Sequence, residues 1–205
     1  MSTDLLESVQ QNLGYPELQK IDANTQVIVS DENTQEESKF SQAAIPAIIA
    51  GLYKYVQSDY GASEFLESGN STNWLKNIFQ ENKKDVIQTI SDYSKQPNEK
   101  IIVRMNAIAA EAVKTVKENL PTDATTKDVK AFLNHQKNNI LLYLPPVLNM
   151  GELLHDNTLD DETNKMEGPV SGLIRGLGDV FSSSVTGNEN HEVKPDIEGK
   201  MEQNY

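Results

Sequence analysis

The sequence predicts an all-α fold, a single multi-helix bundle with a short N-terminal helix and a disordered acidic C-terminal tail. Apolar residues recur at three- and four-residue steps through the middle of the chain, the spacing that places them on one face of a helix. The two-residue alternation that would predict a strand is confined to a short stretch at 26–30. We therefore expect helices alone to build the core.

A short helix is expected at the N-terminus, over residues 4–13. Thr3 is expected to cap it and Gly14 to close it, since these residue types favour helix starts and ends, respectively. Its inner side carries Leu5, Leu6 and Val9. We expect these three side chains to dock on the rest of the protein.

A second helix is predicted over residues 41–58, where apolar residues occur nearly all round the helix. This pattern is typical of a helix buried at the centre of a protein. Pro46 either kinks this helix or lies in its first turn. Ala47, Ala50 and Gly51 offer small side chains against which a neighbouring helix can pack closely.

Three shorter helices are expected next. The first lies between Gly61 and Gly69, and the second carries Trp74 and is capped by Ser71 or Thr72. The third covers residues 85–94. Each is short and amphipathic, so each is expected to pack one face on the core.

The clearest helix begins at Asn98, the expected N-cap, and ends before Pro121. Four charged residues fall outside its apolar stripe: Arg104, Glu111, Lys114 and Lys117. The stripe itself contains Ile101, Ile102, Met105, Ile108, Ala109, Ala112, Val113, Val116 and Leu120.

The last long helix is capped by Thr125 or Thr126 and is ended by Pro145 and Pro146. Its expected inner side contains Val129, Phe132, Leu133, Ile140, Leu141 and Leu144.

The organisation follows from where apolar and charged residues gather. Residues 1–38 form an acidic helix and linker, residues 39–183 the helical domain, and residues 184–205 a disordered tail with almost no apolar side chain. The formal charge is -13, and most of it lies at the two ends. Nucleic acid and anionic membranes bind clustered Lys and Arg, so we expect neither as a partner. The opening residues 1–7 have neither the basic region nor the long apolar stretch of a signal peptide, and no run in the chain approaches the roughly 18 apolar residues of a membrane span, so we expect neither.

The residues that usually carry catalysis do not form a recognisable pattern. The chain has no cysteine, and its three histidines, His135, His155 and His191, lack a partner at helical spacing. A Gly-x-Ser-x-Gly nucleophile signature is absent. The glycines of residues 168–178 lack the Gly-Lys-Ser/Thr of a phosphate-binding loop, and Asp179 follows them. We therefore expect no enzyme activity, no metal site and no cofactor.

The acidic stretch 156–167 has oxygen-bearing side chains at positions one, three, five, nine and twelve, the spacing of an EF-hand calcium loop. Asp161 stands where that loop needs a glycine, and Thr163 where it needs an apolar anchor. The stretch is thus either a solvated surface loop or a weak calcium site.

Residues 169–182 carry a second amphipathic pattern, diluted by Gly172, Gly176 and Gly178. This segment either docks on its own domain, binds a partner helix or groove, or adsorbs to a membrane. Since the Lys-rich polar face of a membrane-surface helix is missing, partner binding or self-association is favoured over membrane binding. The candidate partner-binding residues are Val170, Leu173, Ile174, Leu177 and Phe181.

Two motifs resemble a known family. Residues 44–52, Ala-Ile-Pro-Ala-Ile-Ile-Ala-Gly-Leu, are similar to a helix of the YidB-like bacterial domains of unknown function. Residues 132–137, Phe-Leu-Asn-His-Gln-Lys, followed by Leu144 and Pro145, resemble a second motif of that family, and residues 168–181 resemble its Gly- and Leu-rich end. The resemblance covers roughly residues 40–181. It implies a small cytoplasmic helical domain without assigned catalytic residues.

These observations favour a non-catalytic cytoplasmic protein with an interaction or structural role. The alternative is an enzyme or small-ligand binder whose site forms only in three dimensions.

Overall fold

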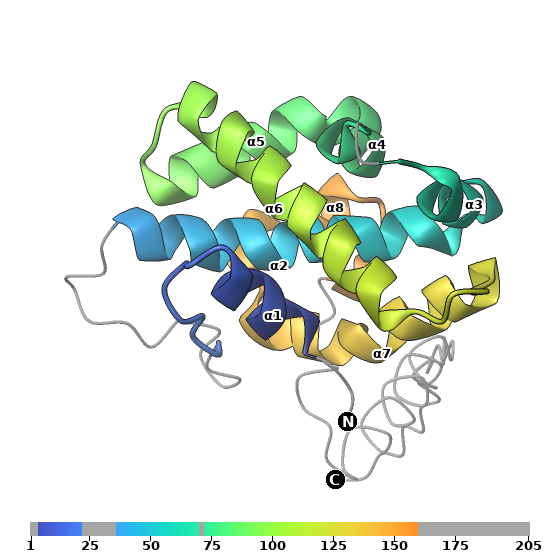
Figure 1. Cartoon of the computed structure of the whole chain (residues 1–205). Helices are drawn as coiled ribbons and strands as arrows, with labels where there is room; N and C mark the ends of the chain where they lie inside the picture. Colours follow the sequence, from blue (N-terminus) through green and yellow to red (C-terminus); the bar gives the residue numbers. More distant parts are fainter. Residues whose placement is uncertain (1–3, 22–35, 70–71, 160–205) are drawn as a thin grey trace, which may run out of the picture. The chain divides into compact units, whose positions relative to one another are not determined.

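The computed structural model describes residues 4–21, 36–69 and 72–159, and within these ranges the chain is helical without a strand (Figure 1). The all-α prediction is confirmed. The helices are α1 (Leu5–Asn12), α2 (Glu36–Gln57), α3 (Asp59–Glu67), α4 (Trp74–Phe79), α5 (Lys83–Ser94), α6 (Asn98–Asn119), α7 (Thr126–Tyr143) and α8 (Met150–Leu153). Short 3₁₀ turns lie at Gln80–Asn82, Pro146–Leu148 and Asn157–Leu159.

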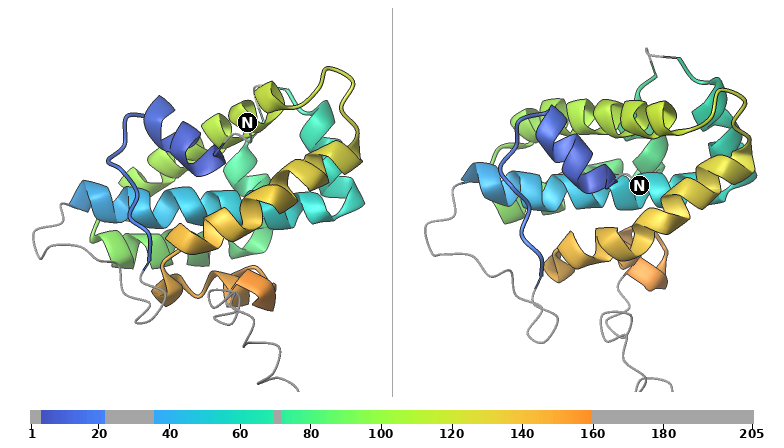
Figure 2. Two further views of the ribbon diagram at one scale, coloured as in Figure 1. Left: turned by 90° about the horizontal axis from the view of Figure 1, so that it is seen from below. Right: turned by 60° about the horizontal axis from the view of Figure 1, so that its bottom comes forward.

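Helix α2 is the centre of the described bundle. Its buried residues run from Phe40 to Val56, and its charged residues lie only near its ends. It contacts α1, α3, α4, α5, α6 and α7. In the two views of Figure 2 it runs through the middle, and the left view shows α6 and α8 on opposite sides of it. The prediction of a central buried helix is therefore confirmed.

Helix α2 begins five residues before the predicted start at 41, so residues 36–38 belong to a helix and not to a linker. The sequence prediction missed this turn because its residues are polar and show no apolar period. The early start places Pro46 well inside the helix, which makes the first-turn alternative wrong. Because proline has no N–H, the helix lacks the hydrogen bond that residue 46 would donate to the carbonyl of Gln42. Residues 22–35 lie outside the described residues.

Three predicted caps differ from the structure by one or two residues. Asp4 caps α1, because its carboxylate accepts the N–H of Glu7 at 3.1 Å. Asn73 caps α4 in the same way, through the N–H of Lys76. Pro97 precedes α6 in extended conformation, so the expected N-cap Asn98 is instead the first helical residue. Of the two residues predicted to cap α7, Thr125 and Thr126, the structure has Thr125, which forms a capping box with Asp128.

The end of α1 is built on Gly14, as predicted. Gly14 has a φ of 68°, in the left-handed region that glycine adopts without strain. The N–H groups of Gly14 and Tyr15 donate to the carbonyls of Gln11 and Gln10, which is the Schellman arrangement. This turn sends the chain back along α2 and α7 as the extended segment 15–21, in which the N–H of Ile21 donates to the carbonyl of Leu142 at 2.8 Å.

The inner face of α6 agrees with the predicted stripe except at Ile102, which is 38% exposed. Its neighbour Val103 is 69% exposed. Four of the larger residues in the rest of the stripe have no solvent-exposed surface and pack in the core: Ile101, Met105, Ile108 and Val116.

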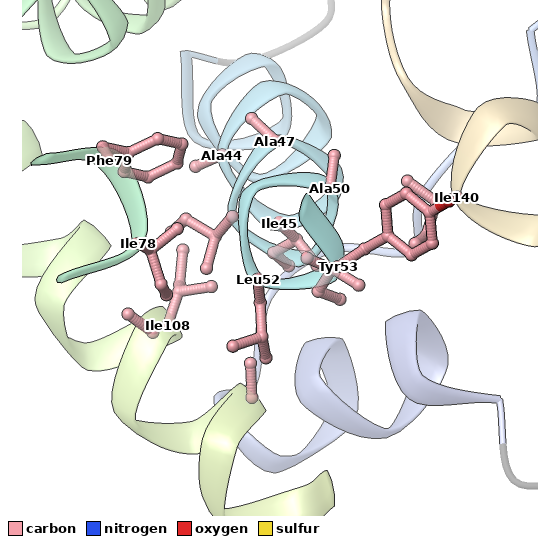
Figure 3. Packing of buried hydrophobic residues seen from close by; sticks show 14 of the residues in the cluster. Ala44, Ile45, Ala47, Ala50, Leu52, Tyr53, Ile78, Phe79, Ile108 and Ile140 are labelled. Atoms are coloured by element: carbon pink, nitrogen blue, oxygen red, sulfur yellow. The ribbon is translucent and has the colours of Figure 1, made fainter. Parts of the chain in front are cut away.

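Small residues of α2 allow α4 to approach closely. A Cβ atom added to Gly51 would lie 2.6 Å from Ile78 Cγ2 and 2.7 Å from Phe79 Cε1. Figure 3 shows Ile78 and Phe79 directed at α2 beside Ala44 and Ala47, with Ile108 of α6 below them. Close packing at this position, expected from the small side chains, is thus confirmed for Gly51.

We expect Ile108→Ala to lower the free energy of unfolding by about 2 to 5 kcal/mol, because it leaves a cavity at a fully buried site of α6. Lys114→Ala, on the exposed side of the same helix, is expected to change it by less than about 0.5 kcal/mol. Denaturant titration of both variants measures the difference. Equal losses would show that the inner face of α6 is assigned incorrectly.

Gly51→Ala tests the α2–α4 contact. Alanine favours a helix over glycine by about 1 kcal/mol, yet its methyl group would overlap Ile78 and Phe79. We expect a net loss of about 1 to 3 kcal/mol, because overpacking a rigid contact forces neighbouring side chains to shift. Gly69→Ala is the control, since a Cβ atom there meets nothing within 4 Å. A stabilised Gly51→Ala variant would contradict the contact.

Candidate functional site

The five candidate partner-binding residues between Val170 and Phe181 lie outside the described residues, and so do His191, the glycines of 168–178 and the predicted tail at 184–205. Partner binding through residues 169–182 therefore stays a prediction. The candidate sites described below lie within residues 4–21, 36–69 and 72–159.

The two described histidines, His135 and His155, are both exposed to solvent. Within the described ranges, no three His, Cys, Asp or Glu side chains gather closely enough to hold a metal ion. No described helix has the length and apolar character needed to cross a membrane.

The start of the acidic stretch 156–167 is tied to the bundle. The carboxylate of Asp156 accepts hydrogen bonds from the backbone N–H of Thr158 at 3.2 Å and from its hydroxyl at 2.6 Å. Its other oxygen lies 3.4 Å from Lys54 Nζ of α2. Although burial opposes the effect, the bonds from Thr158 and the charge of Lys54 lower the pKa of Asp156. The first position of the possible calcium loop is thus already paired with a cation, while residues 160–167 lie outside the described residues.

Buried polar side chains join segments that are distant in sequence. The side-chain carbonyl of Gln42 accepts the N–H of Gln19 at 2.7 Å, and its amide donates to the carbonyls of Gln19 and Tyr143. In α7, the buried Gln136 accepts the N–H of Leu5 at 3.2 Å. These bonds satisfy buried polar groups and hold the N-terminal segment on the bundle.

Arg104 makes a similar connection between α6, α2 and the segment after α1. Its guanidinium donates to Gln96 Oε1 at 2.9 Å, bonds to the carboxylate of Glu37, and lies 3.6 Å from the ring centre of Phe40. Tyr15 covers it at 5.1 Å. Arg104 lies outside the predicted apolar stripe, yet its side chain is partly buried and has partners on three segments. Charge-assisted bonds and ring contacts compensate its partial burial.

A third polar cluster joins α2, α3 and α4. The carboxylate of Glu64 accepts the hydroxyl of Tyr55 and the amide of Asn77, the latter at 2.7 Å. Burial and the Glu64 carboxylate raise the pKa of Tyr55, so its hydroxyl keeps its proton. The cluster is a satisfied structural contact.

An acidic hollow of about 480 Å³ lies between α1, the segment after it and the end of α7. Asp4, Glu7 and Glu17 line it together with Tyr143. Burial, followed by the charges of these three acids, raises the pKa of Tyr143. Asp4 is occupied as the cap of α1, and Glu7 accepts the amide of Gln11 at 2.9 Å.

A second hollow, which we call the α6–α4 hollow, has a volume of about 490 Å³. Gly69 and Trp74 line it, together with residues of α6 between Ala107 and Glu118. Ala107, Ala110 and Val113 contribute apolar wall. Two lysines, Lys114 and Lys117, and two acids, Glu111 and Glu118, contribute the charged groups. Its size lies in the range of small-molecule sites in proteins.

Lys117 is the unusual residue of the α6–α4 hollow. Its ammonium donates to the carbonyl of Ser68 at 2.6 Å and lies 5.5 Å and 5.9 Å from the ring centres of Phe65 and Trp74. No carboxylate of the described residues lies within ion-pair distance of it. Burial lowers the pKa of Lys117. The sequence interpretation missed this site, because Trp74 and Lys117 are far apart in the chain and each fits an ordinary amphipathic helix.

Comparison with known proteins finds no match: no protein-family model, no curated protein and no solved structure matches the chain. The resemblance to YidB-like domains therefore stays a prediction.

We expect calcium at millimolar concentration to leave the melting temperature of the protein unchanged. A loop that bound calcium only in the folded state would raise it by mass action. Lys54 already pairs with Asp156, so a cation would have to displace it. Thermal melts of the wild type, Asp156→Ala and Glu167→Ala test this expectation. A saturable rise in the wild type that both variants lose would contradict it.

Proposed function

We propose that the chain is a non-catalytic cytoplasmic helical protein that acts through protein interaction or as a structural component. In this proposal the binding element is the stripe formed by Val170, Leu173, Ile174, Leu177 and Phe181. The partner that we propose for this stripe is a second copy of the chain.

The observation that carries the proposal is the enclosure of α2. Helices α1 and α3 to α7 surround it, and all of them lie within residues 5–143. The burial of the central helix is thus accounted for without residues 169–182. An apolar stripe of five residues at 170–181, in a region of mostly polar sequence, is typical of a segment that binds another protein surface.

The chemistry of the described polar clusters supports a non-catalytic role. Gln42, Arg104 and Glu64 direct their polar atoms to neighbouring backbone and side chains that hold helices together. A catalytic acid, base or nucleophile needs a polar atom directed at a substrate position. In these three clusters the geometry is that of satisfied structural contacts.

The alternative of a small-ligand binder is favoured by one specific observation. The α6–α4 hollow combines apolar walls with the ammonium of Lys117, which has no carboxylate partner within ion-pair distance among the described residues. This arrangement concerns a different part of the chain from the 169–182 stripe, so the two functions are compatible.

We expect the double substitution Leu173→Asp with Leu177→Asp to abolish self-association of the full chain and to leave its melting temperature unchanged. The two introduced carboxylates would lose their water without gaining partners if the stripe became buried between two copies, which disfavours association. Sedimentation velocity over a range of concentrations measures association, and thermal melting measures stability.

Ser183→Asp with Ser184→Asp is the matched control, because it adds the same charge outside the stripe and should associate like the wild type. A wild type that stays monomeric at all concentrations would contradict the proposal. So would a loss of several kcal/mol of stability in the Leu173→Asp and Leu177→Asp variant, since that loss would place the stripe in the protein's own core.

A further inference from the structure

The α6–α4 hollow contains a positive charge that the described residues do not neutralise. An ammonium group has three donors, and Lys117 uses one of them on the carbonyl of Ser68 at 2.6 Å. The faces of Phe65 and Trp74 stabilise the cation in part. A half-buried cation without a carboxylate partner gains more from a bound anion than a fully solvated lysine does, because less of its charge is screened by water.

The other charged groups of the hollow do not replace that anion. Glu111 is occupied by Lys114 Nζ at 3.3 Å and by the amide of Asn12 at 2.8 Å. Glu118 is exposed to solvent and lies beyond ion-pair distance of Lys117. Lys114 also lines the hollow, but its charge is paired with Glu111, which leaves Lys117 as the cation of the hollow without an ion-pair partner among the described residues. The ligand group that complements Lys117 is therefore negative.

The walls of the hollow call for an apolar body attached to that negative group. Trp74 contributes an aromatic surface, while Ala107, Ala110 and Val113 are apolar and small. The volume of about 490 Å³ leaves room for a short alkyl chain or a ring system. Ala107 and Ala110 are exposed, so a ligand can enter without the bundle opening.

We propose that the α6–α4 hollow binds a small molecule that has an apolar body and a single carboxylate group. The carboxylate accepts a hydrogen bond from Lys117 Nζ, and the apolar body lies against Trp74 and the alanines of α6. This function goes beyond the interaction through residues 169–182 and does not depend on it.

The sole tryptophan of the chain is Trp74, so tryptophan emission comes from a residue that lines this hollow. We expect titration of the full chain with decanoate to change the emission of Trp74 in a saturable way, with a Kd below about 1 mM. Decanol has the same chain without the charge, and we expect it to bind about tenfold more weakly or worse. Decylammonium, which carries the opposite charge, is expected not to bind.

Variants of the full chain separate the two parts of the recognition. Lys117→Met keeps the aliphatic stem and removes the charge, so decanoate should lose about tenfold in affinity and become equal to decanol. Lys76→Met is the matched control, because Lys76 is exposed on the same helix as Trp74 and does not line the hollow. Ala110→Leu narrows the hollow from an exposed helix position, so it should weaken decanoate and decanol alike without lowering the melting temperature.

The proposal is overturned if decanoate gives no saturable change of Trp74 emission up to several millimolar. It is also overturned if decanol binds as tightly as decanoate, or if Lys117→Met and Lys76→Met have the same affinity as the wild type. Leu173→Asp with Leu177→Asp should bind decanoate normally, so a failure of this proposal and a failure of the interaction proposal are distinguishable.

Discussion

The burial of α2 dictates how the other described helices are arranged. A helix that is apolar nearly all round cannot remain in water, since every exposed apolar side chain on it costs free energy. The neighbouring helices α1 and α3 to α7 each place an apolar face on it. The opposite, charged faces of these helices point to solvent. The helices around α2 are therefore amphipathic, whereas α2 itself is apolar nearly all round.

Close packing around α2 also determines where polar residues can be tolerated. Gln42 is 4% exposed, yet its side-chain amide has backbone partners on two other segments. Arg104 has a carboxylate, an amide and two aromatic rings around its guanidinium. Burying either group without hydrogen-bond partners would lower the free energy of unfolding, because the group would lose its bonds to water and gain none in the protein. These contacts therefore fix the position of the N-terminal segment as well as stabilising it.

Electrostatics distinguishes the two hollows of the described bundle. The hollow beside α1 is lined by Asp4, Glu7 and Glu17, two of which are already engaged in the helix that carries them. The α6–α4 hollow has apolar walls and a lysine whose charge lacks a carboxylate within ion-pair distance among the described residues. In the hollow beside α1, the acidic residues stabilise the start of that helix. In the α6–α4 hollow, Lys117 can still bind an anion, and the apolar walls favour an anion that has an apolar body.

Local sequence signals were sufficient to predict the helical class, the central position of α2, the inner face of α6 at every predicted position but Ile102, and the helix ends at Gly14, Pro121 and Pro145. Apolar period and turn residues are local signals, so each can be read without knowing the neighbours in space. The sequence misplaced caps by one or two residues, because several adjacent residues could cap a helix equally well.

The role of residues whose partners lie far along the chain could not be predicted without the arrangement of the helices in space. Arg104 follows the helical spacing of an outward side chain, yet Phe40 and Glu37 of another helix surround it. Lys117 and Trp74 form one hollow although 42 intervening residues separate them. Helix periodicity specifies which face a residue lies on, whereas the crossing of α6 with its neighbours specifies what that face meets, and this crossing results from packing the whole bundle around α2.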